Sequence, residues 1–229
     1  MGTLDGVIRD LVVANRVLAN EGVLDAYGHV SVRHPSDPKR YLISCSRSPQ
    51  WVDAEDILEY SLEGDALSRK GETPYTERHI HGAIYEARPD VLAVVHSHAD
   101  EVLPFSVSSA PLRAVIHTAS GMGARLPVWD IADRFGPTDL LVSNMQHGRD
   151  LAKSLADGRV VLMRGHGFSA VGRTLKEVVK NLFHLRFQSA TERLETPSEI
   201  RKARREVARI MTVQRERQLA AQQPAAKGA

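Results

Sequence analysis

The stretch Val91-Leu92-Ala93-Val94-Val95-His96-Ser97-His98 is an apolar run that ends in two histidines, and it predicts a strand. Side chains two residues apart on a strand point to the same face, so His96 and His98 can aim both imidazoles at one point. A third histidine follows in Arg164-Gly165-His166-Gly167. Three imidazoles hold a divalent metal and leave positions free for water or substrate, as in catalytic metal sites. The alternative is an exposed histidine pair and a separate turn histidine.

Composition bounds the class of protein. The chain has 229 residues, of which 42% are hydrophobic, and this length suits one sizeable core. The formal net charge of +2 gives no strong overall attraction to nucleic acid or to an anionic membrane. A lone Cys45 excludes an internal disulfide framework and favours a reducing compartment, so we expect a cytoplasmic protein. No run of residues approaches transmembrane length.

Helical and extended patterns alternate along the chain, which predicts an α/β fold. Thr3 is a candidate N-cap for an amphipathic helix that begins at Leu4, and residues 30–43 have the pattern of a β-hairpin. A helix over residues 76–87 leads into the strand that carries His96. Further strands are expected at residues 112–117, 128–131 and 160–164, and further helices at residues 145–156 and 174–191.

The C-terminal part is predicted to be a charged helix at about residues 197–219, followed by a frayed tail at 220–229, within a single domain of residues 1–229. Its apolar stripe suits packing on a neighbouring subunit. A nucleic-acid-binding arm is the alternative interpretation of its arginines. Glu206, Glu216 and the lack of aromatic residues argue against that alternative, so no nucleic-acid partner is expected.

Three motifs occur in a set order: Thr76-Glu77-Arg78-His79-Ile80-His81, then His96-Ser97-His98, then Arg164-Gly165-His166-Gly167. Together they resemble the class II aldolase and adducin-head family, from about Leu4 to Thr191. The resemblance implies a three-layer α/β/α fold with a mainly antiparallel central sheet. It also implies a homotetramer, or a higher homo-oligomer, that acts on a small molecule.

The same resemblance implies a metal centre. His96, His98 and His166 match the family's metal ligands, and Glu77 matches its catalytic acid. Imidazole ligands suit several divalent ions, so manganese, zinc, iron and cobalt stay open. A metal next to the substrate's oxygens can hold electrons as an enolate when a carbon–carbon bond breaks, while Glu77 moves a proton. Read alone, Glu77 is better interpreted as a first-turn carboxylate at the positive end of a helix, but beside the three matched ligands the catalytic interpretation is favoured.

The family's phosphate-binding segments are altered in this chain. Sugar-phosphate members read Gly-Asn-Val/Ile-Ser, Thr/Ser-Pro-Ser/Thr-Gly and Ser-Ser-Glu, whereas here the segments are Gly28-His29-Val30-Ser31, Ser44-Cys45-Ser46-Arg47 and Tyr75-Thr76-Glu77. Arg47 replaces a turn glycine with a planar fork suited to a carboxylate, although it could instead cap a surface loop. The substrate contacts expected in these segments are His29, Ser44, Ser46, Arg47 and Thr76.

These segments, with Leu103-Pro104-Phe105-Ser106-Val107, look like the decarboxylases of aromatic breakdown, which act on dihydroxyphthalate or carboxylated hydroxymuconic semialdehydes. His79 is a further candidate contact because many of these relatives carry an aromatic residue there. His117 ends a predicted strand and is another candidate. His81 shares a helix face with Glu77 and is interpreted as an orienting histidine.

The sequence therefore predicts a metal-dependent, non-oxidative decarboxylase of a hydroxylated aromatic or dienoic carboxylic acid. One alternative is a class II aldolase that cleaves an unphosphorylated or carboxylate-bearing hydroxy-ketone. The two reactions share the enolate and differ in what leaves, carbon dioxide or an aldehyde. The alternative of another class is a non-catalytic, adducin-like assembly module.

Overall fold

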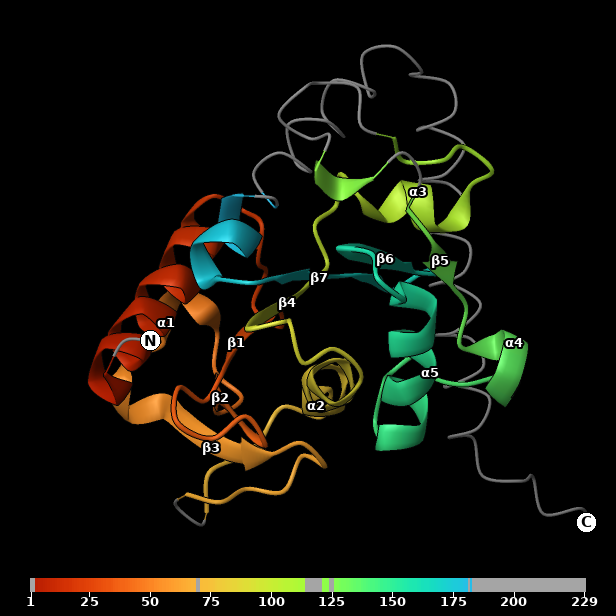
Figure 1. Ribbon diagram of the computed structural model, residues 1–229. Helices are drawn as coiled ribbons and strands as arrows, with labels where there is room; N and C mark the ends of the chain where they lie inside the picture. The colour runs from red at the N-terminus through yellow and green to blue at the C-terminus, as the bar shows by residue number, and fades with distance from the viewer. Residues whose placement is uncertain (1–2, 69–70, 114–120, 124–125, 181, 183–229) are drawn as a thin grey trace, which may run out of the picture.

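A seven-stranded sheet forms the centre of the protein in the order β3-β2-β1-β4-β7-β6-β5 (Figure 1). The structure is a computed structural model that describes residues 3–68, 71–113, 121–123, 126–180 and 182. The strands are β1 (His29–Arg33), β2 (Arg40–Ser44), β3 (Ile57–Ser61), β4 (Ala93–Ser97), β5 (Val128–Trp129), β6 (Val160–Met163) and β7 (Gly167–Gly172). Only β5 and β6 run parallel, so the prediction of a mainly antiparallel sheet is confirmed.

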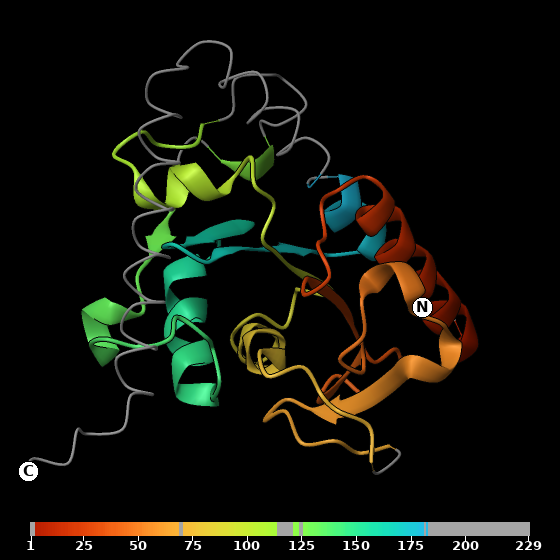
Figure 2. The same ribbon diagram turned by 180° about the vertical axis from the view of Figure 1, so that it is seen from behind.

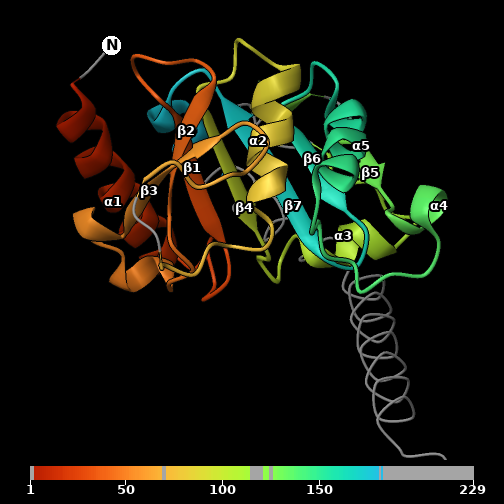
Figure 3. The same ribbon diagram turned by 90° about the horizontal axis from the view of Figure 1, so that it is seen from below.

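Helices cover both faces of this sheet. They are α1 (Leu4–Asn20), α2 (Arg78–Ala87), α3 (Leu103–Val107), α4 (Ala132–Phe135) and α5 (Met145–Leu155), with the short 3₁₀ helices η1 (Pro49–Trp51) and η2 (Ala54–Asp56). Figures 1 and 2 show α2 and α5 together on one side of the sheet, and Figure 3 views them from below. Helices α1 and α3 contribute to the core on the other side.

Strand β4 separates the two cores by simple alternation. Ala93 and Val95 belong to the core that includes α1, whereas Val94 belongs to the core that includes α2 and α5. All three are fully buried, because a strand between two helical layers has no solvent face. The three-layer α/β/α prediction is therefore confirmed. Among the described residues, no helix is both long and apolar enough to cross a bilayer.

Several local predictions hold. The Thr3 Oγ1 atom accepts a hydrogen bond from the Gly6 N–H at 3.2 Å, which caps α1 as expected. The predicted hairpin is the antiparallel pair β1 and β2. Helix α2 begins at Arg78, two residues later than expected, because Glu77 is its N-cap residue.

The other end of α2 is closed by a buried arginine. Arg33 on β1 donates hydrogen bonds to the carbonyl oxygens of Tyr85 and Arg88 at 2.8 and 3.0 Å. It also donates to the carbonyl oxygens of Val91 and Pro38 at 3.0 and 2.6 Å. The last carbonyls of a helix have no partner inside the helix, so this guanidinium supplies one.

Other predictions were incomplete. Strand β5 has only two residues of the expected 128–131, and strands β3 and β7 were not predicted. The expected strand at 112–117 falls largely outside the described residues, and residues 112 and 113 are not in a strand. In the helix expected at 174–191, residues 175–180 and 182 are helical and the remainder lies outside the described residues. The predicted helix at 197–219 and the tail also lie outside them.

Helices α2 and α5 approach closely at Gly148. A Cβ atom there would lie 2.5 Å from the His79 carbonyl oxygen and 3.0 Å from the Ala83 Cβ. Gly148→Ala should therefore lower the free energy of unfolding by about 1–3 kcal/mol, because the two helices must move apart. Urea denaturation measures this. Gly6→Ala is the control, since its Cβ would meet only side-chain atoms, the Thr3 hydroxyl at 3.2 Å and Arg9 Nη2 at 3.9 Å. Equal effects of the two substitutions would contradict the prediction.

Candidate metal centre

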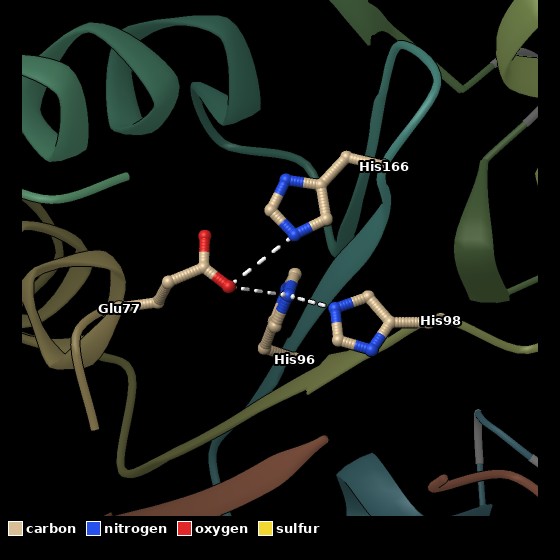
Figure 4. A group of neighbouring side chains, drawn as sticks. All are labelled: Glu77, His96, His98 and His166. Carbon is tan, nitrogen blue, oxygen red and sulfur yellow. Dashed lines mark hydrogen bonds and ion pairs between the residues drawn. The ribbon is translucent and has the colours of Figure 1, made fainter. Parts of the chain in front are cut away.

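The three predicted histidines meet at one end of the central strands. His96 belongs to β4, His98 follows that strand directly, and His166 lies in the turn between β6 and β7. Strands β4 and β7 are hydrogen-bonded neighbours, which brings the turn beside the histidine pair. Figure 4 shows the three rings directed toward one another. His96 is fully buried, and His98 and His166 are partly buried.

Glu77 completes the cluster from the N-terminal end of α2. Its Oε2 atom lies 3.4 Å from His96 Nε2 and 3.3 Å from His166 Nε2 (Figure 4). One ligand atom from each of the four residues lies within 4.8 Å of all the others. Glu77 makes no side-chain bond to its own helix, so the interpretation as a simple helix-terminus carboxylate does not describe it.

Hydrogen bonds on the far side of two rings fix which nitrogen faces the centre. His98 Nδ1 lies 3.1 Å from Asp25 Oδ1, and His166 Nδ1 lies 2.9 Å from the Leu140 carbonyl oxygen. A carboxylate and a carbonyl only accept, so each Nδ1 carries a proton, and it is Nε2 that faces the centre and offers its lone pair whenever the ring is neutral. His96 Nδ1 has Ser169 Oγ at 3.4 Å. Such outer partners orient histidines that bind metals.

This donor set fits a divalent cation. Imidazole lone pairs and the Glu77 carboxylate converge on one small volume, and they repel one another unless a cation lies among them. A proton on one ring removes part of this repulsion. A divalent metal removes it for all four groups. Three imidazoles and one carboxylate suit manganese, zinc, iron or cobalt.

One loop supports two members of the cluster. Leu140 presents its carbonyl oxygen to His166 from a left-handed backbone conformation with φ 69°. Two residues later, the Val142 N–H donates to Glu77 Oε1 at 3.0 Å. A leucine in this conformation is strained, and such strain is typical of functional sites.

Burial and the charges of the cluster shift the pKa values of its members. Burial acts to raise the pKa of Glu77, but the charges and hydrogen bonds of His96 and His166 hold that pKa well below its usual range. Burial lowers the pKa of His96 to about 4. Burial also acts to lower the pKa of His166, but the hydrogen bond and charge of Glu77 raise it above the ordinary 6.5. At neutral pH, His96 is therefore deprotonated and ready to bind a metal.

Metal affinity should fall as the pH is lowered through the raised pKa of His166. A metal binds the deprotonated imidazole, so below that pKa a proton must first leave. Each lost pH unit then weakens binding by about tenfold per proton displaced. Competition between the protein and a chelator for zinc, measured from pH 6 to pH 8, checks this. A pH-independent affinity across that range would contradict it.

Two predicted substrate contacts are buried, and one of them, His29, lies beside the cluster. His29 is buried on β1, and its ring centroid is 5.1 Å from that of His96. Ser44 is fully buried at the end of β2, and its Oγ atom has no hydrogen-bond partner among the described residues. Tyr75 packs between these segments, with its ring 4.5 Å from that of His29, and its hydroxyl donates to the Arg47 carbonyl oxygen.

Other predicted contacts are not brought to the cluster. The Arg47 guanidinium is half-exposed and pairs with both carboxylate oxygens of Asp56, at 2.7 and 2.9 Å, which matches the alternative of a loop-stabilising arginine. Ser46 and Thr76 are exposed. His79 packs against Gly64, where a Cβ atom would lie 2.9 Å from its ring. His117 lies outside the described residues.

Sequence reasoning missed Asp25 and Leu140. Asp25 accepts the N–H groups of Gly28 and Tyr27 at 2.7 and 3.1 Å, a turn that Asp25-Ala26-Tyr27-Gly28 could have signalled. Burial opposes ionisation, but His98 and these N–H groups lower the pKa of Asp25 to about 2. Nothing in the sequence marks Leu140, because its contribution is a carbonyl oxygen.

Comparison with known proteins identifies the family. The model of the Class II Aldolase and Adducin N-terminal domain matches residues 9–191. The chain belongs to this family. A decarboxylase of Talaromyces stipitatus, tropJ, is 36% identical over 185 residues, which cover 75% of this chain and 70% of that protein. The 3,4-dihydroxyphthalate decarboxylase of Terrabacter is 31% identical over 182 residues, or 75% of this chain and 74% of the relative.

Solved structures agree on the fold. An aldolase II superfamily protein from Pseudomonas syringae matches over 91% of this chain and 86% of its own, with a TM-score of 0.74 and 19% identity. The family and its decarboxylase relatives make the chain a carbon–carbon lyase, which sets aside the non-catalytic assembly module.

The C-terminal part of the chain is similar to a second family. The model of ribosomal L29 protein matches residues 171–217. The large ribosomal subunit protein uL29 of Rhodopirellula baltica is 62% identical over 47 residues, which cover 20% of this chain and 65% of that protein. Most of this segment lies outside the described residues.

Proposed function

We propose that the chain is a metal-dependent, non-oxidative decarboxylase of a hydroxylated aromatic or dienoic carboxylic acid, of the dihydroxyphthalate or carboxy-hydroxymuconic semialdehyde type. The observation that carries this proposal is the convergence of His96, His98, His166 and Glu77 in a chain whose relatives include decarboxylases. The rewritten phosphate segments support an acid rather than a sugar phosphate as substrate.

The reaction requires the site to stabilise the electrons left on the substrate and to transfer a proton. The carbon–carbon bond to the carboxylate breaks, carbon dioxide leaves, and the bonding electrons stay on the substrate. The three histidines would hold a divalent metal, and that metal would supply a Lewis acid next to the substrate oxygens. A proton must then join the carbon that lost the carboxylate. Glu77 is in position to relay it, and because its carboxylate is ionised it first takes that proton from a hydroxyl group of the substrate.

Carbon dioxide release tests this proposal directly. The metal-loaded protein is given a panel of ortho-hydroxy carboxylates, including dihydroxyphthalates and carboxylated hydroxymuconic semialdehydes, beside a chelated control. Release that depends on the metal supports the proposal and names the substrate class. No release from any member, with metal confirmed bound, would overturn it.

A class II aldolase acting on an unphosphorylated hydroxy-ketone is the alternative that the same centre supports. The products separate the two reactions, because an aldolase yields an aldehyde fragment and no carbon dioxide.

The homotetramer also stays a prediction. Light scattering of the purified chain measures its oligomeric state.

A second function is favoured by a separate observation. We propose that the segment 171–217 associates with the large ribosomal subunit, because 47 residues of the chain are 62% identical to a protein of that subunit. The segment has a formal charge of +6, whereas the whole chain has +2. Such a local excess of basic groups can contact RNA phosphates without any aromatic residue, which weakens the argument made from Glu206 and Glu216.

Co-sedimentation with purified large bacterial ribosomal subunits tests this second function. The wild-type chain should pellet with the subunits, and Arg204→Glu with Arg205→Glu should not. Arg9→Glu with Lys39→Glu, two exposed positions outside the segment, is the charge-matched control. Equal pelleting of the two double variants, or none by the wild-type chain, would overturn the proposal.

A further inference from the structure

A row of four buried side chains leads away from the metal centre. His29 begins it on β1, where it lies opposite His96 in the antiparallel pairing with β4. His29 Nδ1 lies 2.7 Å from His81 Nε2, and His81 Nδ1 lies 2.6 Å from Ser31 Oγ. The Ser31 hydroxyl lies 2.8 Å from the hydroxyl of Tyr85. None of the four is more than 1% exposed, so each proton in the row is placed by the neighbouring group and not by bulk water.

Each member of the row is uncharged. Burial lowers the pKa of His81 to about 3, so its imidazole carries one proton on one nitrogen. The 2.7 Å contact between His29 Nδ1 and His81 Nε2 requires one of these two nitrogens to be an unprotonated acceptor. Burial raises the pKa of Tyr85 well above its usual value, so its hydroxyl keeps its proton. The row can then point in only two directions, since each group donates to the next one along.

The tyrosine end selects one direction. Among the described residues, the Tyr85 hydroxyl has two partners: Ser31 Oγ, which can accept its proton, and the backbone N–H of Val94, which can only donate. If Ser31 donated to Tyr85, the buried phenolic proton would have no acceptor, which costs about 1–3 kcal/mol of desolvation. The Arg33 guanidinium lies over the Tyr85 ring, 4.7 Å from its centroid, and a cation there makes the phenol a better donor. Tyr85 therefore donates to Ser31.

The remaining protons follow from that choice. Ser31 donates to His81 Nδ1, so His81 carries its own proton on Nε2 and donates it to His29 Nδ1. His29 must then carry its proton on Nε2. That atom makes no hydrogen bond among the described residues. The His29 ring lies beside that of His96, with the two centroids 5.1 Å apart, so the inferred N–H belongs to a ring next to the metal centre.

We infer that the row from Tyr85 through Ser31 and His81 sets His29 as a neutral N–H donor to an anionic oxygen of the substrate. The inference rests on the proposed function, and it names the feature that the site selects: a negatively charged oxygen group beside the oxygens that face the metal ligands. His29 is the contact, and the other three are positioning residues. A neutral donor with a fixed proton binds such a group without competing with the histidine ligands for the metal.

Two measurements test the inference. The nitrogen-15 chemical shifts of labelled histidine separate protonated from unprotonated ring nitrogens, and His29→Gln and His81→Gln assign the signals. The wild-type protein with zinc should carry the His29 proton on Nε2. A proton on Nδ1 would overturn the inference, and this readout requires neither a substitution in the row nor any activity.

The second measurement compares two ligands. 2,3-Dihydroxybenzenesulfonate carries an anionic group that cannot leave as carbon dioxide, and catechol lacks that group. The wild type should prefer the sulfonate, and Tyr85→Phe should reduce that preference by about tenfold, the effect of one hydrogen bond to a charged group. Tyr60→Phe is the control, because Tyr60 is an equally buried tyrosine outside the row. An unchanged preference in Tyr85→Phe would overturn the inference.

Different results would overturn the proposed decarboxylase function and the inference about His29. Carbon dioxide release with the His29 proton on Nδ1 overturns the inference and leaves the decarboxylase. The predicted proton position and ligand preference without carbon dioxide release overturn the decarboxylase and leave His29 as an anion-selecting donor.

Discussion

Replacing Glu77 with glutamine should lower the rate of carbon dioxide release by about 10²–10⁴-fold, the usual effect of losing a positioned acid–base group. The amide has the same shape and its oxygen can still accept the Val142 N–H, which is 3.0 Å from Oε1 in the wild type. It cannot carry a proton to the substrate carbon. The loss should therefore appear in kcat, with the fold unchanged.

The measurement is the steady-state rate of carbon dioxide release with the metal content of each sample determined. Glu86→Gln is the matched control, because Glu86 lies on the same helix and pairs with Arg149 at the surface. Full metal content with a wild-type rate in Glu77→Gln would show that Glu77 does not carry the proton. If Glu77→Gln lost both its metal and its activity, Glu77 would act primarily as a metal ligand.

Arg33→Met should cost the protein about 3 kcal/mol or more of its free energy of unfolding, because several carbonyl oxygens lose their donor at once. The methionine can fill much of the space but donates no hydrogen bond. The carbonyls of Tyr85 and Arg88 at the end of α2 are then left without Arg33's N–H groups. The free energy of unfolding of Arg33→Lys should lie between those of the wild type and Arg33→Met, since an ammonium has three donors.

Urea denaturation with circular dichroism measures these differences. Arg40→Met is the control, because Arg40 is a neighbouring surface arginine whose partners Asp37 and Glu59 are carboxylates that water can solvate. Arg40→Met should change stability little. If Arg33→Met proved as stable as Arg40→Met, the buried guanidinium would not hold the end of α2.

The metal cluster could be predicted from sequence because its members are marked by residue type. His96, His98 and His166 are rare residues in a recognisable spacing, and their motifs also carried the family resemblance. Helix α1, the β1–β2 hairpin and helix α5 were predicted for a similar reason, since each has a clear apolar period. Strand β7 was missed because every residue from Gly167 to Gly172 is buried, so no alternation marks it.

The partners of the cluster could not be predicted, because they meet only in three dimensions. Arg47 has the charge expected of a carboxylate-binding residue, and its pairing with Asp56 depends on where η2 ends. His79 and His81 are two residues apart, yet one packs on Gly64 and the other hydrogen-bonds to His29. Helix spacing separates their directions, but it does not say which direction meets the site.

The loop that carries Leu140 and Val142 constrains how this enzyme can evolve. It orients His166 through one peptide group and Glu77 through another, so a change of its path disturbs the metal's third nitrogen and the proton carrier together. Strand β1 does not hold both His166 and Glu77 in this way. Diversification of substrate preference is therefore expected at His29, while the 140–142 loop tolerates little drift.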